Sequence, residues 1–237
     1  MPDHTVDIAL LYPELLGTYG DRGNALVLRR RCELRGIEAR VIEVRARDAV
    51  PNSAEIYLVG GAEDAPQLTG MELLRESGAL HAAVGAGAVL FAVCAGFQIV
   101  GTELPGRDGK MIEGLGLVDA RTVRAPKRLV GELAVYDDVL GTGWLVGFEN
   151  HGGVTTPGPD AQPLGRRVPE SGFATEGAVQ GKVVGTYLHG PALARNAALA
   201  DRLLEWVLGP LAPLADEQAD LLHSERLAAI NVPRLSS

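Results

Sequence analysis

The chain has 237 residues, 46% of them hydrophobic and 22% charged, which is the composition of a globular protein with a sizeable core. A net charge of −8 and the lack of a basic block argue against a nucleic-acid partner. Two cysteines provide no disulfide framework, no apolar run reaches the roughly 20 residues of a membrane helix, and the start "MPDHTVDIALLY" is unlike a signal peptide, so a cytoplasmic location is expected.

The first half of the chain alternates predicted strands and helices. "VDIALLY" (6–12) is an apolar run typical of a buried strand, and residues 24–36 carry apolar positions at helical spacing before a glycine. Further strands are predicted at 38–44, 55–61 and 88–94, and a further helix at 67–80. This order predicts a parallel sheet with helices on both faces, whose functional loops lie together at the carboxyl ends of the strands.

The second half has a different pattern. Short strands punctuated by glycines, some of them antiparallel, are predicted in "GLGLVDARTVR", "RLVGELAVY", "GWLVGFENHGG" and "GAVQGKVVGTYLHG". Helices are predicted at 194–209 and at about 215–230. We predict a single domain over residues 1–237 with its core at about 6–208. The last helix covers the sheet or docks on a partner, and both alternatives stay open.

A cysteine ends the strand in "VLFAVCAGFQIVG" (89–101). A turn from strand to helix would lift Cys94 above the sheet, and the small residues after it would let a substrate approach. The N–H groups of Ala95 and Gly61 would then donate to the oxyanion that forms on an attacked carbonyl. The alternative is a buried cysteine that only packs, which is how free cysteines usually behave.

A histidine partner for this cysteine is expected close in space and not in sequence. His189 is the best candidate, because it ends the predicted strand of "VVGTYLHGP" and is followed by glycine. His151 in "FENHGG" also ends a strand and competes with it. The others are poorer partners, since His4 is terminal and His81 and His223 lie on helical patterns.

Five motifs together resemble a known family. "VCAGFQ" is similar to the Cys-x-Gly-x-Gln elbow of class I glutamine amidotransferases, and "TYLHG" resembles the histidine segment of their cobyric-acid-synthase-like branch. With "YGDRGN", "GGAED" and "FENHGG" in the same order, the chain resembles the GatD group of glutaminase subunits over residues 6 to about 208. The resemblance implies a flavodoxin-like fold, with a central, mostly parallel sheet flanked by helices and an added antiparallel portion.

The resemblance also implies a reaction. Cys94 would attack the carboxamide of L-glutamine to give a γ-glutamyl thioester and ammonia, and His189 would carry the proton from the thiol to the leaving amine. Gln98, one turn past the nucleophile, would shape the glutamine pocket, unless it is a helix residue that faces solvent.

Glutamine's α-carboxylate requires a forked cation, and Arg128 matches a basic position of the family. The alternative is a surface arginine that only happens to be near the pocket. Three further basic residues lie close to it in the sequence: Arg121, Arg124 and Lys127.

The acid that orients the histidine is missing from its usual place. Many class I enzymes have a glutamate two residues after the histidine, whereas this chain continues Gly190-Pro191-Ala192. Glu149, Glu63 and Asp64 are candidates to replace it. We hypothesise that the third member is weak or is donated by a partner chain.

The loop "YGDRGN" contains no obvious nucleophile. Asp21 or Asn24 would cap the following helix, or the loop, with Arg22, would form a pocket wall or a partner contact. His151 is expected to be structural or to line the ammonia route.

No ATP site is visible, because "GRDGKM" (106–111) lacks the spacing and the preceding strand of a phosphate loop. No metal site is expected in this chain either. The resemblance therefore implies a Mur-ligase-like partner, MurT, that uses ATP and magnesium to activate the α-carboxyl of D-glutamate in the stem peptide of lipid II. Through lipid II the protein would reach the inner face of the membrane.

Other functions stay open. The chain could supply ammonia to another acceptor, such as a cobyrinate-type carboxylate, although the cobyric acid enzymes carry their synthetase on the same chain. It could also be a partner-binding scaffold without activity, or another hydrolase or redox protein with a cysteine elbow.

Overall fold

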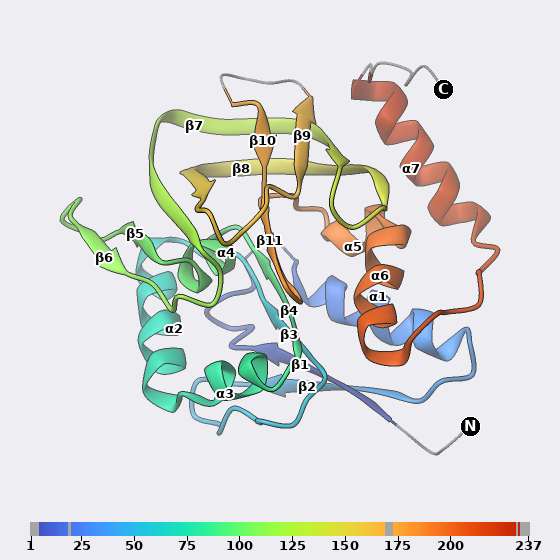
Figure 1. Cartoon of the computed structure of the whole chain (residues 1–237), viewed down its shortest axis with the longest axis horizontal. Coiled ribbons are helices and arrows are strands. Elements are labelled where there is room, and N and C mark those ends of the chain that lie inside the picture. Colours follow the sequence, from blue (N-terminus) through green and yellow to red (C-terminus); the bar gives the residue numbers. More distant parts are fainter. Residues whose placement is uncertain (1–4, 19, 169–172, 231, 233–237) are drawn as a thin grey trace.

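A six-stranded sheet forms the centre of the computed structural model, which describes residues 5–18, 20–168, 173–230 and 232 (Figure 1). Its order is β11-β12-β4-β3-β1-β2, and every neighbouring pair is parallel except β11 with β12. The strands are β1 (Val6–Leu11), β2 (Ala39–Val44), β3 (Ile56–Val59), β4 (Val89–Val93), β11 (Ala178–Gln180) and β12 (Val183–Thr186). The predicted α/β fold with a mostly parallel sheet is confirmed.

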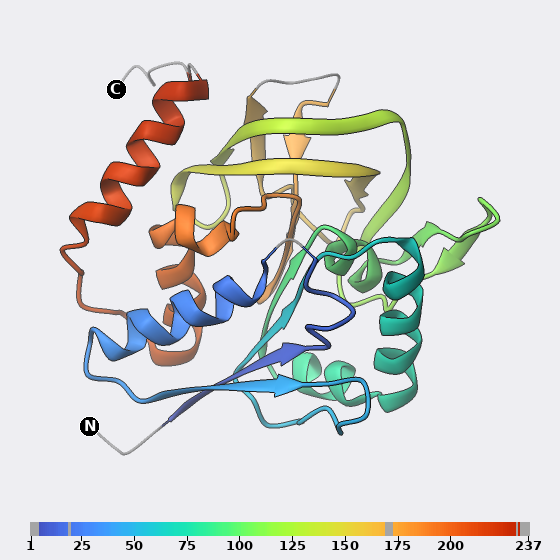
Figure 2. The same ribbon diagram turned by 180° about the vertical axis from the view of Figure 1, so that it is seen from behind.

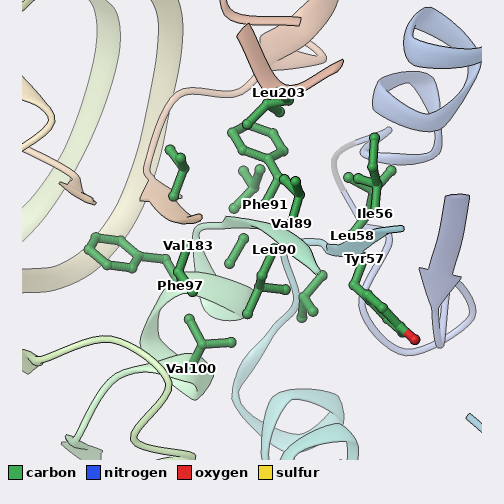
Figure 3. Close-up of a cluster of buried hydrophobic side chains, with 14 of the residues drawn as sticks. Ile56, Tyr57, Leu58, Val89, Leu90, Phe91, Phe97, Val100, Val183 and Leu203 are labelled. Carbon is green, nitrogen blue, oxygen red and sulfur yellow. The ribbon is translucent and has the colours of Figure 1, made fainter. Parts of the chain in front are cut away.

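Helices cover both faces of this sheet. Figures 1 and 2 show α1 (Arg22–Glu33) and α6 (Ala197–Leu208) on one side, and α2 (Asp64–Ser77) and α3 (Ala79–Gly85) on the other. The central strands β3 and β4 are therefore buried throughout, which explains their continuous apolar sequences. Phe91 of β4 lies among the side chains of this core (Figure 3).

Two predicted helices are each divided into two. The helix predicted at 67–80 ends at Gly78, which adopts a left-handed φ of 64° before α3 begins. The helix predicted at 194–209 consists of α5 (Ala192–Arg195) and α6, which are separated at Asn196. The side-chain amide of Asn196 accepts from the N–H of Val146 at 2.7 Å and donates to its carbonyl at 2.8 Å, so it serves the neighbouring strand at the break.

The antiparallel portion forms a second sheet with longer strands than predicted. "ARTVR" and "RLVGELAVY" belong to one strand, β7 (Ala120–Asp137), which pairs with β8 (Gly143–Pro157) and has a register shift between Arg124 and Leu129. The remaining strands are β5 (Glu103–Pro105), β6 (Met111–Glu113), β9 (Gly165–Val168) and β10 (Thr175–Glu176). "GRDGKM" connects β5 to β6 in an antiparallel hairpin, a context unlike that of a phosphate loop.

The C-terminal helix α7 (Glu217–Ile230) was predicted at 215–230, and none of its residues is buried. It lies against α5 and the β7–β8 pair, to one side of the parallel sheet (Figure 1). Its main contacts are thus with α5 and the antiparallel strands and not with the parallel sheet, and docking on a partner stays a prediction. Among the described residues, no helix is long and apolar enough to cross a membrane.

Candidate active site

Cys94 occupies a strained turn between β4 and the short helix α4 (Ala95–Val100). Its φ of 55° and ψ of −110° lie in a region that residues with a side chain rarely adopt. The Cys94 N–H donates to the carbonyl of Thr186 on β12 at 2.8 Å, which holds the turn against the neighbouring strand. A Cβ at Gly96 would overlap with the carbonyl of Val59, so the close approach of α4 to β3 requires glycine there. The predicted nucleophile elbow is thus present in the backbone.

The thiol of Cys94 is held in its neutral form. Burial raises its pKa to about 12, against a smaller lowering effect from the Ala95 N–H, which donates to the sulfur. The negative charge of Asp21 raises the pKa further, and Arg128 lowers it. Because only the thiolate is a strong nucleophile, attack requires a base that removes the proton as the substrate binds.

His189 lies at the same edge of the sheet. It follows β12, which pairs in parallel with β4, so the two strands place Cys94 and His189 at neighbouring carboxyl ends. Two backbone hydrogen bonds of 3.0 Å with Phe148 of β8 hold the histidine in place. Burial lowers the pKa of His189 to about 4, and the nearby His151 adds to this effect. The imidazole is therefore neutral near pH 7, the state that a general base needs.

Asp21 is the carboxylate beside His189. Its Oδ1 lies 4.0 Å from His189 Nδ1, and the residue is 2% exposed. The other oxygen, Oδ2, accepts from the N–H of Gly61 at 2.7 Å. That bond corrects one prediction, since an N–H that donates to Asp21 is not available to an oxyanion. Burial raises the pKa of Asp21 to about 6, against the lowering effect of the Gly61 bond.

A polar cavity of about 460 Å³ opens beside the thiol. This volume lies within the range of small-molecule sites. Its lining includes Cys94, Ala95, Gln98, Arg128, Arg124, Glu63, Asp64, Asn150 and His151. The structure therefore brings four of the predicted site residues to one pocket: the cysteine, Ala95, Gln98 and Arg128.

Arg128 reaches this pocket from the irregular part of β7. Its Nε donates to Asn150 Oδ1 at 2.7 Å, while the residue as a whole is exposed. The guanidinium is thus oriented and still accessible to a carboxylate. Of the other basic residues, Arg124 also lines the pocket, whereas Arg121 pairs with Glu103 at 2.6 Å outside it.

Gln98 is held at both ends of its amide. Nε2 donates to the Tyr187 hydroxyl at 3.1 Å, and Oε1 accepts from Gln67 Nε2 at 2.8 Å. The Tyr187 hydroxyl in turn bonds Thr155 at 2.6 Å. Gln98 therefore forms part of a fixed pocket wall, and the alternative of a helix residue facing solvent is wrong.

His151 lines the pocket and also belongs to a buried cluster behind it. Its ring stacks on Tyr187 with centroids 3.8 Å apart. Nδ1 faces the Gly153 carbonyl at 2.7 Å and Nε2 faces Glu149 at 3.2 Å, while Glu149 also accepts from Arg167 at 2.8 Å. Glu149 is thus engaged by His151 and Arg167.

The other candidate acids and histidines make different contacts from those of Asp21 and His189. Asp64 lies 3.9 Å from Arg124, and Glu63 precedes α2 at the pocket. His81 and His223 contact backbone carbonyls elsewhere, and His4 lies outside the described residues. No group of three or more His, Cys, Asp or Glu residues in the described ranges could hold a metal ion.

Glu176 was not among the predicted site residues, and it lies buried beside the segment that leads to His189. It accepts from the Tyr187 N–H at 2.5 Å and from the Thr186 hydroxyl at 3.1 Å. Burial raises the pKa of Glu176 to about 7, against the lowering effect of these donors. A glutamate in "ATEGAVQG" has no sequence feature that distinguishes it from a solvated one.

Comparison with known proteins decides the family. A sequence model of the CobB/CobQ-like glutamine amidotransferase domain matches residues 7–197. The chain belongs to this family. The resemblance to class I glutamine amidotransferases inferred from the motifs is confirmed.

Similar proteins of known name show which members of the family this amidotransferase resembles. It is 34% identical over 208 residues to the GatD subunit of lipid II isoglutaminyl synthase (glutamine-hydrolyzing) from Staphylococcus aureus, a match covering 85% of this chain and 84% of that one. The corresponding Streptococcus pneumoniae subunit is 34% identical over 212 residues, covering 86% and 81%. A cobyric acid synthase from Sphingopyxis alaskensis is 38% identical over 128 residues, but only 24% of that enzyme is covered.

Solved structures support the fold. A crystal structure of a glutamine amidotransferase superimposes with a TM-score of 0.58 at 23% identity, covering 84% of this chain and 97% of the other. One from Thermotoga maritima gives a TM-score of 0.55 at 15% identity, covering 96% and 92%. At these identities the likeness concerns the fold alone.

Proposed function

We propose that this amidotransferase is the glutamine-hydrolysing subunit of a two-subunit synthase and supplies ammonia to a Mur-ligase-like partner. The observation that carries the proposal is the strained Cys94 elbow, which opens on a polar pocket that Arg128 also lines. The similarity to GatD subunits over most of the chain supports the same assignment.

The reaction begins with proton transfer. His189 takes the proton of the Cys94 thiol as the sulfur attacks the side-chain carbonyl carbon of L-glutamine. When the sulfur bonds to carbon, the Ala95 N–H that donates to it becomes available to the developing oxyanion.

The intermediate then breaks down in two steps. The imidazolium of His189 gives its proton to the amide nitrogen, and the carbon–nitrogen bond breaks. Ammonia departs, and the γ-glutamyl group remains bound to Cys94 as a thioester. Water hydrolyses the thioester with His189 as base, so that glutamine and water give glutamate and ammonia. Throughout, Arg128 holds the α-carboxylate, while Gln98 and Ala95 form the wall that positions the carboxamide.

The group that accepts the ammonia is bound and activated by the partner. We propose a MurT-like ligase subunit that binds ATP and magnesium and activates the α-carboxyl of D-glutamate in the stem peptide of lipid II, which the ammonia converts to D-isoglutamine. This chain then needs no metal or nucleotide of its own. It works on the cytoplasmic side of the membrane and reaches lipid II through the partner.

The proposal is tested by measuring glutamate release with and without the ligase subunit. We expect low turnover by the isolated chain, because the Cys94 thiol is buried and its pKa is raised, and an increase when the partner is added. Amidated lipid II is expected only with both subunits, ATP and magnesium. Equal turnover with and without the partner, or amidation of a cobyrinate-type acceptor in its place, would contradict the proposal.

A further inference from the structure

Both ring nitrogens of His151 face groups that accept hydrogen bonds. Nδ1 lies 2.7 Å from the carbonyl oxygen of Gly153, and Nε2 lies 3.2 Å from Glu149 Oε2. A neutral imidazole carries a proton on one nitrogen only, and a carbonyl oxygen can only accept. The short contact with Gly153 therefore requires a proton on Nδ1, and the state of Nε2 depends on whether Glu149 is ionised.

Arg167 holds Glu149 in its ionised form. The guanidinium Nη2 of Arg167 donates to both carboxylate oxygens, at 2.8 and 3.1 Å, and both side chains are buried. Burial raises the pKa of Glu149, but the hydrogen bond from His151 and the charge of Arg167 outweigh this effect and hold the pKa below its usual value. An ionised carboxylate has no proton to donate, so Nε2 of His151 must carry one as well.

The surroundings of the ring suit a positive charge. The ring lies flat on that of Tyr187, with centroids 3.8 Å apart and planes 14° from parallel, and an aromatic face attracts a cation. The negative charge of Glu149 offsets the cost of burying the imidazolium. Arg167 and Glu176 share a cavity with His151 on one side, and on the other side its charged neighbours in the glutamine pocket are Arg124, Arg128, Glu63 and Asp64.

A charge on His151 acts on the base of the reaction. Burial lowers the pKa of His189, and the positive charge of His151 lowers it further, to about 4. His151 also follows Asn150, which accepts from Arg128 Nε at 2.7 Å, so the same side chain holds the β8 wall that orients the arginine.

We propose that His151 is a buried imidazolium that keeps the base His189 uncharged and fixes the β8 wall of the pocket. This inference rests on the proposed glutamine hydrolysis, in which His189 must be uncharged to take the thiol proton. His151 is a positioning residue, because both of its N–H groups are occupied by Glu149 and Gly153 and it exchanges no proton in the reaction. With no free lone pair on its ring, it cannot itself replace His189 as the base.

The charge of His151 is tested by NMR of the full wild-type chain with ¹⁵N-labelled histidine at pH 7.5. We expect both ring nitrogens of His151 to carry hydrogen, with its signals assigned by their loss in His151→Gln. A nitrogen without hydrogen would overturn the proposal. In Glu149→Gln the carboxylate is gone, so His151 is expected to keep only the proton that faces Gly153, and retention of both protons would show that Glu149 does not hold the charge.

The effect on His189 is tested by the pH dependence of kcat/KM for glutamate release, with each variant assembled with the ligase subunit. This parameter falls at low pH as the base of the free enzyme is protonated. Loss of the charge on His151 raises the pKa of His189, so in His151→Gln and in Glu149→Gln the fall is expected to begin at higher pH, by at least ~0.5 unit. A loss of rate by the same factor at every pH would overturn the proposal, because a defect in the pocket wall alone has that effect.

His81→Gln is the matched control and should keep the wild-type pH profile. His81 also faces a backbone carbonyl, that of Leu115 at 2.6 Å, but does not line the pocket. If the wild-type complex releases no glutamate, the proposed function fails, whereas the NMR spectrum still decides the charge of His151. If the ring is neutral while glutamate is released, this inference alone fails.

Discussion

Gln98 donates a hydrogen bond of 3.1 Å to the hydroxyl of Tyr187, which connects the helix behind Cys94 to the segment that carries His189. Tyr187 is 4% exposed and stacks on His151, so the same ring also contacts the β8 wall of the pocket. The relative positions of the nucleophile, the base and the pocket wall are thus coupled through one buried side chain.

Cys94→Ala is expected to lower glutamate release at least ~1,000-fold, because no other described thiol adjoins the pocket and the covalent step is lost. The melting temperature should change little, since the turn geometry remains. The control is Cys32→Ala, which removes the other free cysteine, buried in α1. Turnover of Cys94→Ala within tenfold of wild type would exclude a cysteine mechanism.

Arg128→Ala is expected to raise KM for glutamine by ~10–100-fold with a smaller change in kcat, because a charged hydrogen-bond donor to the substrate carboxylate contributes about 1.5–3 kcal/mol. Arg128→Lys should recover part of this, since it keeps the charge but not the fork. Steady-state kinetics of glutamate release gives the comparison. Arg121→Ala, which removes the pair with Glu103 outside the pocket, serves as control, and an equal rise in its KM would show that only general charge matters.

Two adjacent glycines test the fixed pocket wall. A Cβ at Gly153 would lie 2.5 Å from Gln98 Nε2 and 3.0 Å from the Tyr187 hydroxyl, whereas one at Gly152 meets nothing within 4 Å. Gly153→Ala is therefore expected to cost about 1–3 kcal/mol in the free energy of unfolding and to impair turnover. Gly152→Ala should be close to wild type in urea unfolding, and equal losses in both variants would contradict the wall assigned to Gln98.

The free energy of unfolding is expected to depend on pH through the carboxyl group of Glu176. Its pKa rises from 4.5 to about 7, so the native state holds this proton more tightly than the unfolded chain does. The free energy of unfolding contributed by this group therefore falls as pH rises from about 4.5 to 7, by an amount on the order of 3 kcal/mol.

Glu176→Gln should remove this part of the pH dependence, as followed by urea unfolding at pH 5 and pH 8. The half-exposed Glu103 serves as the control for the substitution, since Glu103→Gln should leave the dependence as it is. If the two variants respond alike to pH, the buried proton is not on Glu176.

The fold class was predictable because its signal is local. The apolar runs at β3 and β4 and the helical spacing in α1 depend on neighbours along the chain, and each appears close to its predicted position. The break at Asn196 and the length of β7 depend on contacts with β8, which no local pattern contains.

Part of the candidate site was also predictable from local sequence. Cys94 and His189 each end a strand before small residues, and that feature is visible in the chain. The prediction for the third acid considered residues close in sequence to a histidine, or on the "GGAED" loop. It did not consider Asp21, whose carboxylate lies 4.0 Å from the imidazole of His189.

The sequence by itself determined the parallel sheet, the family and the two residues at the strand ends, because periodicity and motif order are properties of the chain. Only the tertiary structure decided that Asp21 faces His189, that Gly61 donates to Asp21, and that Glu149 is engaged by His151 and Arg167. Hydrogen bonds and burial depend on which side chains the sheet edge brings together, and that set is defined by strand order, not by distance along the chain.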